Sequence, residues 1–322
     1  MVNKLRLGIL GYANIAKKSM IDNFIGSDEF ILSKIGSRKN DKLKEVIEKY
    51  NTKGVLGYEE VVNDPKIDCI YIPLPTGLHF EWAKECILSG KHVMIEKSIC
   101  TSLKETRELI KLSELKNVCV FENFMFQYND QYKVIHELLK EGTIGDIKLL
   151  KSSFGFPIFD PQTNIRYKRD LGGGALLDAG AYVLKGSQFL AGINQKVVSS
   201  RMVMHKEYNV DFHGYVTLES ENGLVSQLSY GFDNYYQNMI EIWGSKGIIK
   251  TERAYTSPSN FEHIITISNN NESKDIVVNS SNPGITICKK FAESIKSKDL
   301  SENQKILRQA QLIHLVKSKS KG

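Results

Sequence analysis

A lysine stands directly after a short apolar run of the chain. Residues His92–Ile95 indicate a strand buried on both faces, and Glu96 and Lys97 come next. In an open parallel sheet, ligands bind beyond the carboxyl ends of the strands, so Lys97 would stand at a binding crevice. Its ammonium group could donate a hydrogen bond to a substrate oxygen on which negative charge develops. Taken in isolation, a lysine at a strand end is more often a solvated surface residue, so its interpretation depends on the surrounding motifs.

A glycine-containing turn separates the first predicted strand from the first predicted helix. Its order is Gly8-x-x-Gly11-x-Ala13, followed by Asn14 and Ile15, whereas the usual dinucleotide fingerprint is G-x-G-x-x-G/A. Gly11 would let the backbone approach a pyrophosphate, and the N–H groups at the helix start would receive its charge. Tight strand–helix turns use glycine in any case, but the strand–turn–helix context favours a dinucleotide site.

The residues around the second predicted strand bear on which nicotinamide is bound. An acidic residue after this strand would hold a ribose 2′-hydroxyl and favour NAD. Asp28 and Glu29 precede the strand Phe30–Gly36, whereas Ser37 and Arg38 follow it. A hydroxyl and a guanidinium suit a 2′-phosphate. We therefore favour NADP and keep NAD as the alternative, since Arg38 could also be a solvated loop residue.

The first part of the chain alternates between two periodicities. Short runs rich in Ile and Val are Leu5–Leu10, Phe30–Gly36, Cys69–Ile72, His92–Ile95 and Val118–Phe121. Helical patterns between them are Asn14–Phe24, Asp41–Tyr50, Leu78–Ser89 and Ser102–Leu115. Strands that alternate with helices of this length predict crossover connections and a parallel sheet covered on both faces. The fold class is therefore α/β, with an N-terminal doubly wound Rossmann domain at residues 1–122.

The rhythm changes after Glu122. One helical stretch, Tyr132–Glu141, precedes glycine-rich turns and segments that alternate with period two. These segments are Lys148–Phe154, Val197–Met204, Val216–Glu219, Leu224–Ser229 and Ile264–Ser268. Such alternation predicts a large, mostly antiparallel sheet. We expect residues 123–322 to form an α+β domain for substrate binding and oligomerisation.

Composition excludes several classes of protein. The chain has 322 residues, 43 Lys+Arg against 37 Asp+Glu, 41% hydrophobic and 25% charged residues, which is typical of a globular protein of two domains. The charge is spread along the chain apart from a Lys/Ser tail after Leu315, which we expect to fray, so nucleic-acid binding has no support. No apolar run approaches the roughly 20 residues of a membrane span. Five cysteines without CxxC or Cys/His spacing indicate a reduced cytoplasmic protein without zinc.

Four segments together resemble the Gfo/Idh/MocA family of nicotinamide-dependent sugar oxidoreductases. They are "LGILGYANIA", "CIYIPLPTGLHFEWAKECILSGKHVMIEKS", "LGGGALLDAGAYVLKGSQFL" and "IEIWGSKGII". The third segment is most similar to the branch with sugar-nucleotide ketoreductases, glucose–fructose oxidoreductase and dihydrodiol dehydrogenase. In that branch a tyrosine, here Tyr182, replaces the usual catalytic histidine. With the domain order, the likeness covers nearly the whole chain.

The resemblance implies roles for individual residues. Glu96-Lys97 matches the family's Glu-Lys-Pro, whose lysine points at the substrate carbonyl beside the nicotinamide, and Asp178 and Tyr182 match its Asp-x-Gly-x-Tyr/His. The residues that match the loop bordering the cofactor are Leu74, Pro75, Thr76 and His79. Arg166 matches an arginine near the nicotinamide. His79 could equally be an ordinary residue at a helix N-terminus.

Two positions depart from the family pattern. Ser98 stands where proline is usual, and a non-proline cis peptide costs about 3 kcal/mol, so the cis bond often found there is less expected. Gln127 replaces the arginine of a related Glu-Ala-Phe-Met-x-Arg stretch, which removes one cation near the substrate. The substrate could therefore differ from those of near relatives.

The proposed chemistry is hydride transfer to or from a carbonyl carbon. Lys97 would hydrogen-bond the oxygen and depress the pKa of the Tyr182 phenol, which is about 10 in free tyrosine. Tyr182 would donate the proton in reduction and accept it in oxidation. Asp178, four residues before Tyr182, shares a helical face with it if Ala175–Leu190 is a helix. Asp178 could orient a sugar hydroxyl or hold Lys97, and Lys185 is a less favoured catalytic lysine.

The substrate residues and the function retain alternatives. We take Asn123 as a substrate residue, and Tyr235, Tyr236 and Gln237 either line a sugar pocket or cover the open sheet or an oligomer contact. The first hypothesis is an NADP(H)-dependent oxidoreductase acting on a ketone or secondary alcohol of a sugar or nucleotide-linked sugar. The alternatives are a dehydrogenase of a free polyol, inositol or dihydrodiol, and a non-catalytic nicotinamide or sugar sensor. We expect a homodimer or homotetramer, because a bare sheet face needs a partner.

Overall fold

The computed structural model describes residues 4–258, 261–279 and 282–320. The chain divides into two compact units, of which the first joins residues up to 123 with residues 284–307. The second unit joins residues 124–283 with residues 308 onward. The expected boundary at residue 122 lies beside the first division, but the segment 284–307, which the sequence analysis assigned to the second domain, belongs to the first unit.

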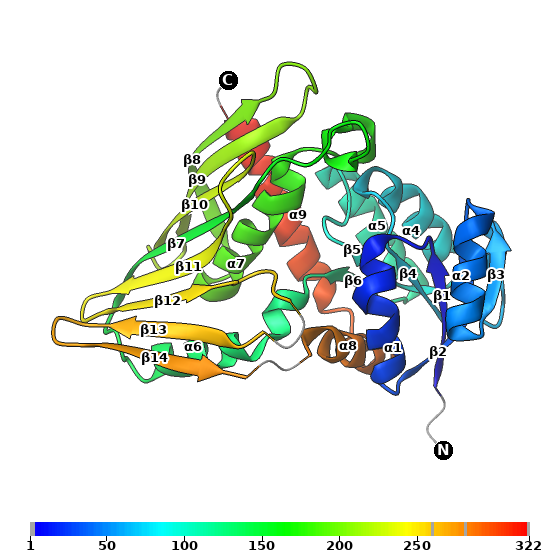
Figure 1. Cartoon of the computed structure of the whole chain (residues 1–322), viewed down its shortest axis with the longest axis horizontal. Helices are drawn as coiled ribbons and strands as arrows, with labels where there is room; N and C mark the ends of the chain where they lie inside the picture. The colour runs from blue at the N-terminus through cyan, green and yellow to red at the C-terminus, as the bar shows by residue number, and fades with distance from the viewer. Residues whose placement is uncertain (1–3, 259–260, 280–281, 321–322) are drawn as a thin grey trace. The chain divides into compact units, whose positions relative to one another are not determined.

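The first unit is built on a six-stranded sheet in which every pairing is parallel (Figure 1). Its strands are β1 (Leu5–Leu10), β2 (Phe30–Ser37), β3 (Lys53–Leu56), β4 (Cys69–Ile72), β5 (His92–Glu96) and β6 (Val120–Asn123). The order β3-β2-β1-β4-β5-β6 is that of a Rossmann fold, with its switch point between β1 and β4. The doubly wound class is confirmed, while the short strand β3 was missed because it carries no apolar run.

Helices cover both faces of this sheet. They are α1 (Ile21–Gly26), α2 (Asn40–Tyr50), α3 (Glu59–Val62), α4 (His79–Leu88), α5 (Leu103–Lys116) and α8 (Pro283–Ser297). Side chains of β4 alternate between the faces: Ile70 and Ile72 join the core cluster of α3 to α5, and the Tyr71 ring lies 5.4 Å from that of Phe24 in α1. Phe291 of α8 packs against Phe30 at 6.1 Å. This burial explains why α8 belongs to the first unit despite its late position in the sequence.

The second unit contains an eight-stranded sheet in the order β14-β13-β12-β11-β7-β10-β9-β8 (Figure 1). The first four strands along the chain are β7 (Ile147–Phe156), β8 (Gln195–Met204), β9 (Asp211–Ser220) and β10 (Val225–Phe232). The others are β11 (Gln237–Gly244), β12 (Ile248–Glu252), β13 (His263–Ser268) and β14 (Ser273–Val278). β7 and β10 pair in parallel and every other pair is antiparallel, so the prediction of a mostly antiparallel sheet is confirmed.

Three helices, α6 (Asp130–Lys140), α7 (Ala181–Ala191) and α9 (Glu302–Lys319), contribute to the core of this unit. Val316 of α9 is fully buried in that core, and its carbonyl accepts a hydrogen bond from Ser200 Oγ at 2.9 Å. Lys319 Nζ donates to the Val197 carbonyl of β8. The expectation that the tail after Leu315 frays is therefore wrong, because it continues α9 and docks on the sheet.

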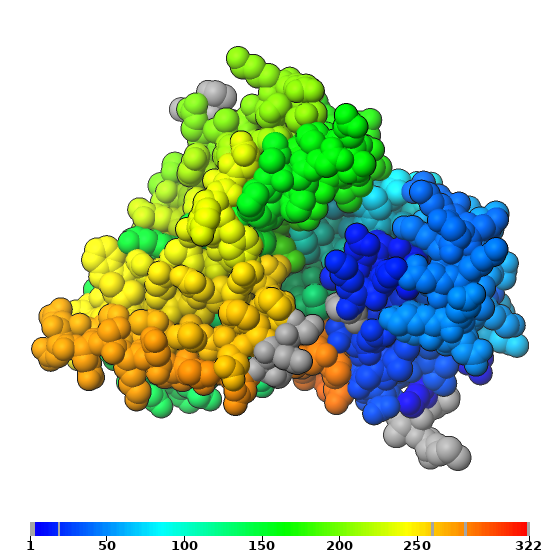
Figure 2. Space-filling view, viewed as in Figure 1, coloured from blue at the N-terminus to red at the C-terminus, as the bar shows by residue number. Residues whose placement is uncertain are grey.

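The other face of the large sheet is not covered by a described helix. One row of outward side chains crosses four strands through the pairs Val225–Leu149, Leu149–Trp243 and Trp243–Ile248. The Trp243 side chain remains 47% exposed. Strands β11 to β14 reach the surface directly, yellow to orange in Figure 2. Among the described residues, none of the helices is long and apolar enough to cross a membrane.

Candidate active site

The glycine turn after β1 is held against the loop after β4. Gly11 has a φ of +98°, and its N–H donates to the Gly36 carbonyl at 2.8 Å. A Cβ at Gly11 would lie 2.9 Å from Leu74 Cδ2, so glycine is required both by the backbone conformation and by this close approach. Gly8 lies inside β1, where a Cβ would approach Val61 to 2.6 Å. Gly8 therefore serves strand–helix packing, and Gly11 shapes the turn.

The helix that follows the turn begins at Asn14 and contains a π-helical turn at Ala16–Met20. Asn14 is exposed, and Ala13 and Ile15 are partly exposed. N–H groups in the first turn of a helix lack acceptors within the helix and favour an anion. The glycine at position 11 of the turn, the helix start and the β1/β4 switch point together fit the pyrophosphate of a dinucleotide.

Ser37 and Arg38 lie at the carboxyl end of β2, as the sequence predicts. Ser37 is buried and its Oγ accepts a hydrogen bond from the Lys39 N–H at 3.2 Å, whereas Arg38 is exposed. Burial raises the pKa of the Tyr58 phenol, and the neighbouring Arg38 guanidinium opposes that rise. Arg38 is thus a cation at the carboxyl end of β2. In this fold, residues at that position recognise the 2′ group of the adenosine ribose. Asp28 pairs instead with Lys4 at 3.4 Å, at the start of the strands.

Glu96 holds the end of β5 beside Lys97. Its Oε1 accepts hydrogen bonds from the Tyr71 hydroxyl and from Asn123 Nδ2, both at 2.6 Å. Burial raises the pKa of Glu96, while these two donors and the charge of Lys97 oppose the rise. Asn123 is therefore engaged with Glu96 at the end of β6. Together Glu96 and Asn123 link three strand ends next to the predicted catalytic lysine.

The peptide bond between Lys97 and Ser98 is cis. The expectation that serine in place of proline disfavours this isomer is therefore wrong for this chain. Ser98 is buried, and its carbonyl lies 2.9 Å from His79 Nδ1. The contact with His79 uses the backbone carbonyl of residue 98, so either serine or proline at that position could form it.

In the second unit, Asp178 forms an ion pair with Arg166. The Arg166 Nε donates to Asp178 Oδ2, and Asn164 Oδ1 accepts from the Arg166 backbone N–H at 3.0 Å. The guanidinium lies beside two aromatic rings that contact each other, 5.5 Å from the centroid of Phe156 and 4.7 Å from that of Phe159. Arg166 and Asp178 therefore form one fixed charged group.

The helix that carries Asp178 and Tyr182 is not α-helical throughout. Residues Leu176–Gly180 form a π-helical turn before α7, and such turns occur often at functional sites. The prediction of a helix at Ala175–Leu190 is confirmed in extent. Positions four apart remain on one side of a helix through such a turn, so the expectation that Asp178 and Tyr182 share a face is not contradicted.

Four aromatic rings surround the ring of Tyr182. The centroid distances are 5.6 Å to Phe124, 6.0 Å to Phe126, 5.2 Å to Phe154 and 5.7 Å to Tyr255. Phe124 and Phe154 pack edge to face on Tyr182, and Phe126 and Tyr255 are tilted against it. Such packing restricts ring orientation. The Tyr182 ring is thus held by packing, independently of its hydroxyl group.

Lys185, the less favoured lysine, is only 6% exposed. Its Nζ lies 5.4 Å from the centroid of the Phe124 ring, in cation–π geometry. Lys185 is therefore buried against Phe124, a ring that also packs on Tyr182.

Sequence reasoning missed Asp211, which caps the helix bearing Asp178. Asp211 Oδ2 accepts a hydrogen bond from the Leu176 N–H at 2.6 Å, and a Cβ at Gly174 would collide with its Oδ1. Burial raises the pKa of Asp211, and hydrogen bonds from the N–H groups of Leu176 and Ala175 oppose the rise. The glycine run before the helix is the only signal in the sequence, because the partner strand cannot be read locally.

The residues predicted to line a sugar pocket, Tyr235, Tyr236 and Gln237, differ in how far their side chains are exposed. The Tyr235 side chain is 89% exposed, and Gln237 is exposed at the start of β11. The Tyr236 hydroxyl accepts a hydrogen bond from Arg253 at 2.8 Å, and the guanidinium lies 4.4 Å from its ring centroid. Arg253 is therefore a further cation beside Tyr236 that the sequence analysis missed.

Gln127 stands where the family pattern has an arginine, and its Nε2 donates to the Phe124 carbonyl at 3.3 Å.

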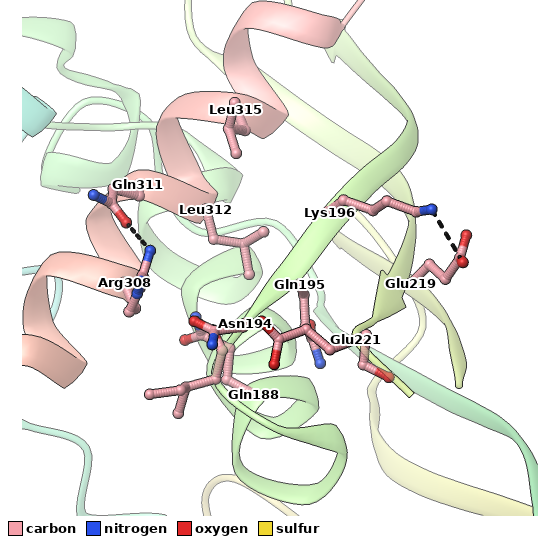
Figure 3. Close-up of a pocket in the computed structure, with 12 residues that line it drawn as sticks. Gln188, Asn194, Gln195, Lys196, Glu219, Glu221, Arg308, Gln311, Leu312 and Leu315 are labelled. Atoms are coloured by element: carbon pink, nitrogen blue, oxygen red, sulfur yellow. Dashed lines mark hydrogen bonds and ion pairs between the residues drawn. The ribbon is translucent and has the colours of Figure 1, made fainter. Parts of the chain in front are cut away.

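A cavity of about 420 Å³ lies elsewhere in the second unit, among the end of α7, the start of β8 and α9 (Figure 3). Two pairs of its polar side chains contact each other, Lys196 with Glu219 at 3.0 Å and Arg308 with Gln311 at 3.1 Å, whereas the buried Asn194 Oδ1 has no hydrogen-bond partner among the described residues. None of its described lining residues is a predicted site residue.

The parallel sheet, the glycine turn and the helix start define the class of Rossmann-fold dinucleotide-binding proteins. The chain belongs to the Gfo/Idh/MocA family. The family model described as "Oxidoreductase family, NAD-binding Rossmann fold" matches residues 5–124, and the "GFO/IDH/MocA C-terminal domain" matches residues 132–250. The family resemblance is thus confirmed, and the protein is an NAD(P)-dependent oxidoreductase.

Several relatives are named as sugar-nucleotide reductases. The chain is 36% identical to a dTDP-3,4-didehydro-2,6-dideoxy-alpha-D-glucose 3-reductase from Saccharopolyspora spinosa, over 83% of this chain and 80% of that protein. It is similar to the 3-ketoreductase KijD10 from Actinomadura kijaniata, solved with NADP and TDP-benzene. The TM-score is 0.95 at 29% identity, covering 99% of this chain and 98% of that one. A trans-1,2-dihydrobenzene-1,2-diol dehydrogenase from Xenopus laevis is 31% identical over 77% of this chain and 74% of that protein.

Proposed function

We propose that the protein is an NADP(H)-dependent ketoreductase that acts on a nucleotide-linked sugar. The observation that carries the proposal is the likeness over nearly the whole chain to a 3-ketoreductase solved with NADP and TDP-benzene. This chain places Lys97 after the Glu96 network and holds Tyr182 among four aromatic rings. Both predicted groups therefore stand in ordered surroundings that suit a catalytic role.

In the proposed reaction, a reduced nicotinamide cofactor bound at the Gly11 turn would supply the hydride that the carbonyl carbon of the sugar accepts. As the C–H bond forms, the π bond of the carbonyl breaks and its electron pair moves to oxygen. Lys97 donates a hydrogen bond to that oxygen, and Tyr182 gives it a proton. The reverse sequence oxidises the alcohol. The Arg166–Asp178 pair would orient a sugar hydroxyl group, since Asp178 is already held by Arg166.

The relative from Actinomadura kijaniata offers further support for this pair. Its solved forms include a variant with one tyrosine replaced by phenylalanine and variants with one lysine replaced by alanine or glutamate, all with NADP and TDP-benzene. A lysine and a tyrosine were thus the residues chosen for replacement in that protein. The same two residue types carry the chemistry proposed for this chain.

A substrate screen tests the proposal. The purified protein would be incubated with NADPH and three sets of carbonyl compounds: keto-sugars linked to dTDP, free keto-sugars, and simple ketones. Loss of nicotinamide absorbance with the dTDP-linked set, at a kcat/KM at least tenfold above the free sugars, is expected. Equal rates with free and linked sugars would reject a nucleotide-linked substrate.

A free dihydrodiol or polyol remains the second candidate. The 31% identity to the Xenopus laevis dihydrodiol dehydrogenase favours it. The same screen run in the oxidative direction, with NADP⁺ and dihydrodiols, inositol or free polyols, separates the two. Turnover confined to that set would establish the second candidate in place of the first.

We also propose that the protein is a cytoplasmic homodimer or homotetramer formed through the open face of the large sheet. The row Val225, Leu149, Trp243 and Ile248 gives a second copy an apolar strip to cover. Light scattering of the purified protein should give a mass of two or four chains. Trp243→Asp should shift that mass toward the monomer, and an unchanged mass would place the interface elsewhere.

A further inference from the structure

We propose that His79 is a positioning residue that fixes the segment carrying Lys97 against the loop bordering the cofactor turn. His79 is the first residue of α4 and its side chain is 0% exposed. Its Nε2 lies 2.7 Å from the Leu74 carbonyl oxygen and its Nδ1 lies 2.9 Å from the Ser98 carbonyl oxygen. One rigid ring therefore spans the loop after β4 and the segment after β5. The inference rests on the catalytic role proposed for Lys97.

The position of the ring excludes direct contact with a bound dinucleotide. A fully buried side chain has no surface to offer, and both of its ring nitrogens already face backbone carbonyl oxygens. The expectation that His79 itself binds the cofactor is replaced here by an indirect role. His79 acts on the cofactor through Leu74 and on the substrate oxygen through the chain next to Lys97.

Each end of this link leads to a group that the proposed reaction uses. Leu74 lies against the glycine turn, since a Cβ at Gly11 would approach its Cδ2 to 2.9 Å. Ser98 directly follows Lys97, so the contact with its carbonyl fixes the backbone one residue beyond the lysine. A shift of either loop would change the distance between the cofactor turn and the ammonium group, and misplacement of about 1 Å can cost a hundredfold in rate.

Histidine is well suited to this position. Its two nitrogens point in different directions from one flat ring; the neutral ring donates to one of the two carbonyls, with either nitrogen able to carry the proton, and only the protonated ring donates to both. A glutamine amide could donate to one carbonyl but would not fill the space of the ring. Phenylalanine would fill the space and donate to neither carbonyl. The two replacements therefore separate the packing of the ring from its hydrogen bonds.

The test compares His79→Gln and His79→Phe with His92→Gln. His92 lies at the opposite end of β5, where its Nδ1 accepts the Cys119 N–H at 2.9 Å. Three quantities would be measured: kcat and KM for the reaction, the NADPH dissociation constant by fluorescence titration, and amide hydrogen exchange of residues 96–100. The proteins would be used as full chains, and the melting temperature would be recorded for each.

We expect His79→Phe to lower kcat at least thirtyfold and His79→Gln about tenfold, with the KM for the sugar within threefold of wild type. The NADPH dissociation constant should rise a few-fold, and exchange of residues 96–100 should accelerate. His92→Gln should keep wild-type kcat at a similar loss of melting temperature. If His79→Phe does not fold, His79→Gln decides the outcome alone.

The inference is overturned if folded His79 variants keep wild-type kcat and exchange, or if His92→Gln loses kcat to the same extent. A wild-type protein with no turnover on any substrate would reject the proposed function instead. In that case the NADPH affinity and the exchange of residues 96–100 still decide whether His79 holds the two segments together.

Discussion

The carboxylate of Asp211 accepts a hydrogen bond from the Leu176 N–H at 2.6 Å, across 35 residues of sequence. This carboxylate supplies the cap that the start of the Tyr182 helix does not obtain from its own side chains. N–H groups at a helix start require an acceptor, and a negative charge there also favours the helix dipole. The orientation of a helix bearing two predicted site residues is thus fixed by a strand that follows it.

Asp211→Ala should therefore reduce both stability and turnover. Loss of the cap leaves buried N–H groups without their acceptor, so the free energy of unfolding should fall by about 2 kcal/mol. We expect kcat to fall more than tenfold in the folded fraction, and Asp211→Asn to lose less because it keeps one acceptor. Urea denaturation and steady-state kinetics measure the two effects. Glu219→Gln, on the same strand and paired with Lys196, is the control and should change neither by much.

Lys97→Met should abolish most turnover and leave NADPH binding nearly intact. Methionine keeps much of the length of the side chain and removes the charge that would stabilise the substrate oxygen, an interaction typically worth a hundredfold or more in kcat. Stopped-flow measurement of nicotinamide oxidation would report the hydride step, and fluorescence titration would report cofactor affinity. Unchanged turnover would remove Lys97 from the mechanism.

Tyr182→Phe should lower kcat by about a hundredfold to ten-thousandfold with little change in melting temperature. The four surrounding rings pack against the aromatic ring in either residue, so the substitution keeps that packing and removes the proposed proton donor. The melting temperature and the kcat would be measured on the same preparation. A variant that keeps full activity would show that the proton comes from another group.

Arg38→Ala should discriminate between the two nicotinamide cofactors. If the exposed guanidinium after β2 binds the 2′-phosphate, its removal weakens NADPH binding at least tenfold and leaves NADH binding within twofold. Dissociation constants for both cofactors would be determined by titration. Lys39→Ala, the neighbouring exposed cation, is the control. Equal losses for NADPH and NADH would argue against phosphate recognition by Arg38.

The histidines predict how stability depends on pH. Burial lowers the pKa of His79, His92, His136 and His263 from the ordinary value of 6.5. Below that value the unfolded chain binds protons that the folded chain excludes, so stability falls as the pH decreases from about 6.5. At His263, Nε2 also lies 2.9 Å from Asn129 Nδ2, a donor that this nitrogen can accept only when it is unprotonated.

Urea denaturation at several pH values between 5 and 7 would measure this slope. His263→Gln should flatten it by at most about 1.4 kcal/mol per pH unit. The raised pKa values of Glu96 and Asp211 act in the opposite sense, because the folded state retains protons above the ordinary carboxyl range. A slope that is identical in His263→Gln would show that this ring does not contribute.

Much of the fold followed from local features of the sequence. Apolar runs of four to eight residues between helical patterns indicated β1, β2, β4, β5 and β6, and period-two alternation indicated the large sheet. The glycine turn and the lysine after β5 could also be recognised locally. These features depend on side-chain period and backbone freedom, which neighbouring residues determine. Strands β3, β11, β12 and β14 were not among the segments named from the sequence, and β3 has no buried residue that would mark it.

The tertiary structure alone decided which distant residues meet. α8 returns to the first sheet because Phe291 completes a core with Phe30 and Phe121, far away in the sequence. Asp211 caps the Tyr182 helix, and His79 lies between the Leu74 and Ser98 carbonyls, because strand order places those segments side by side. Local periodicity carries no information about such neighbours. The sequence by itself determined the class of fold and the candidate lysine, and the packing of the sheets determined the groups that hold the site in place.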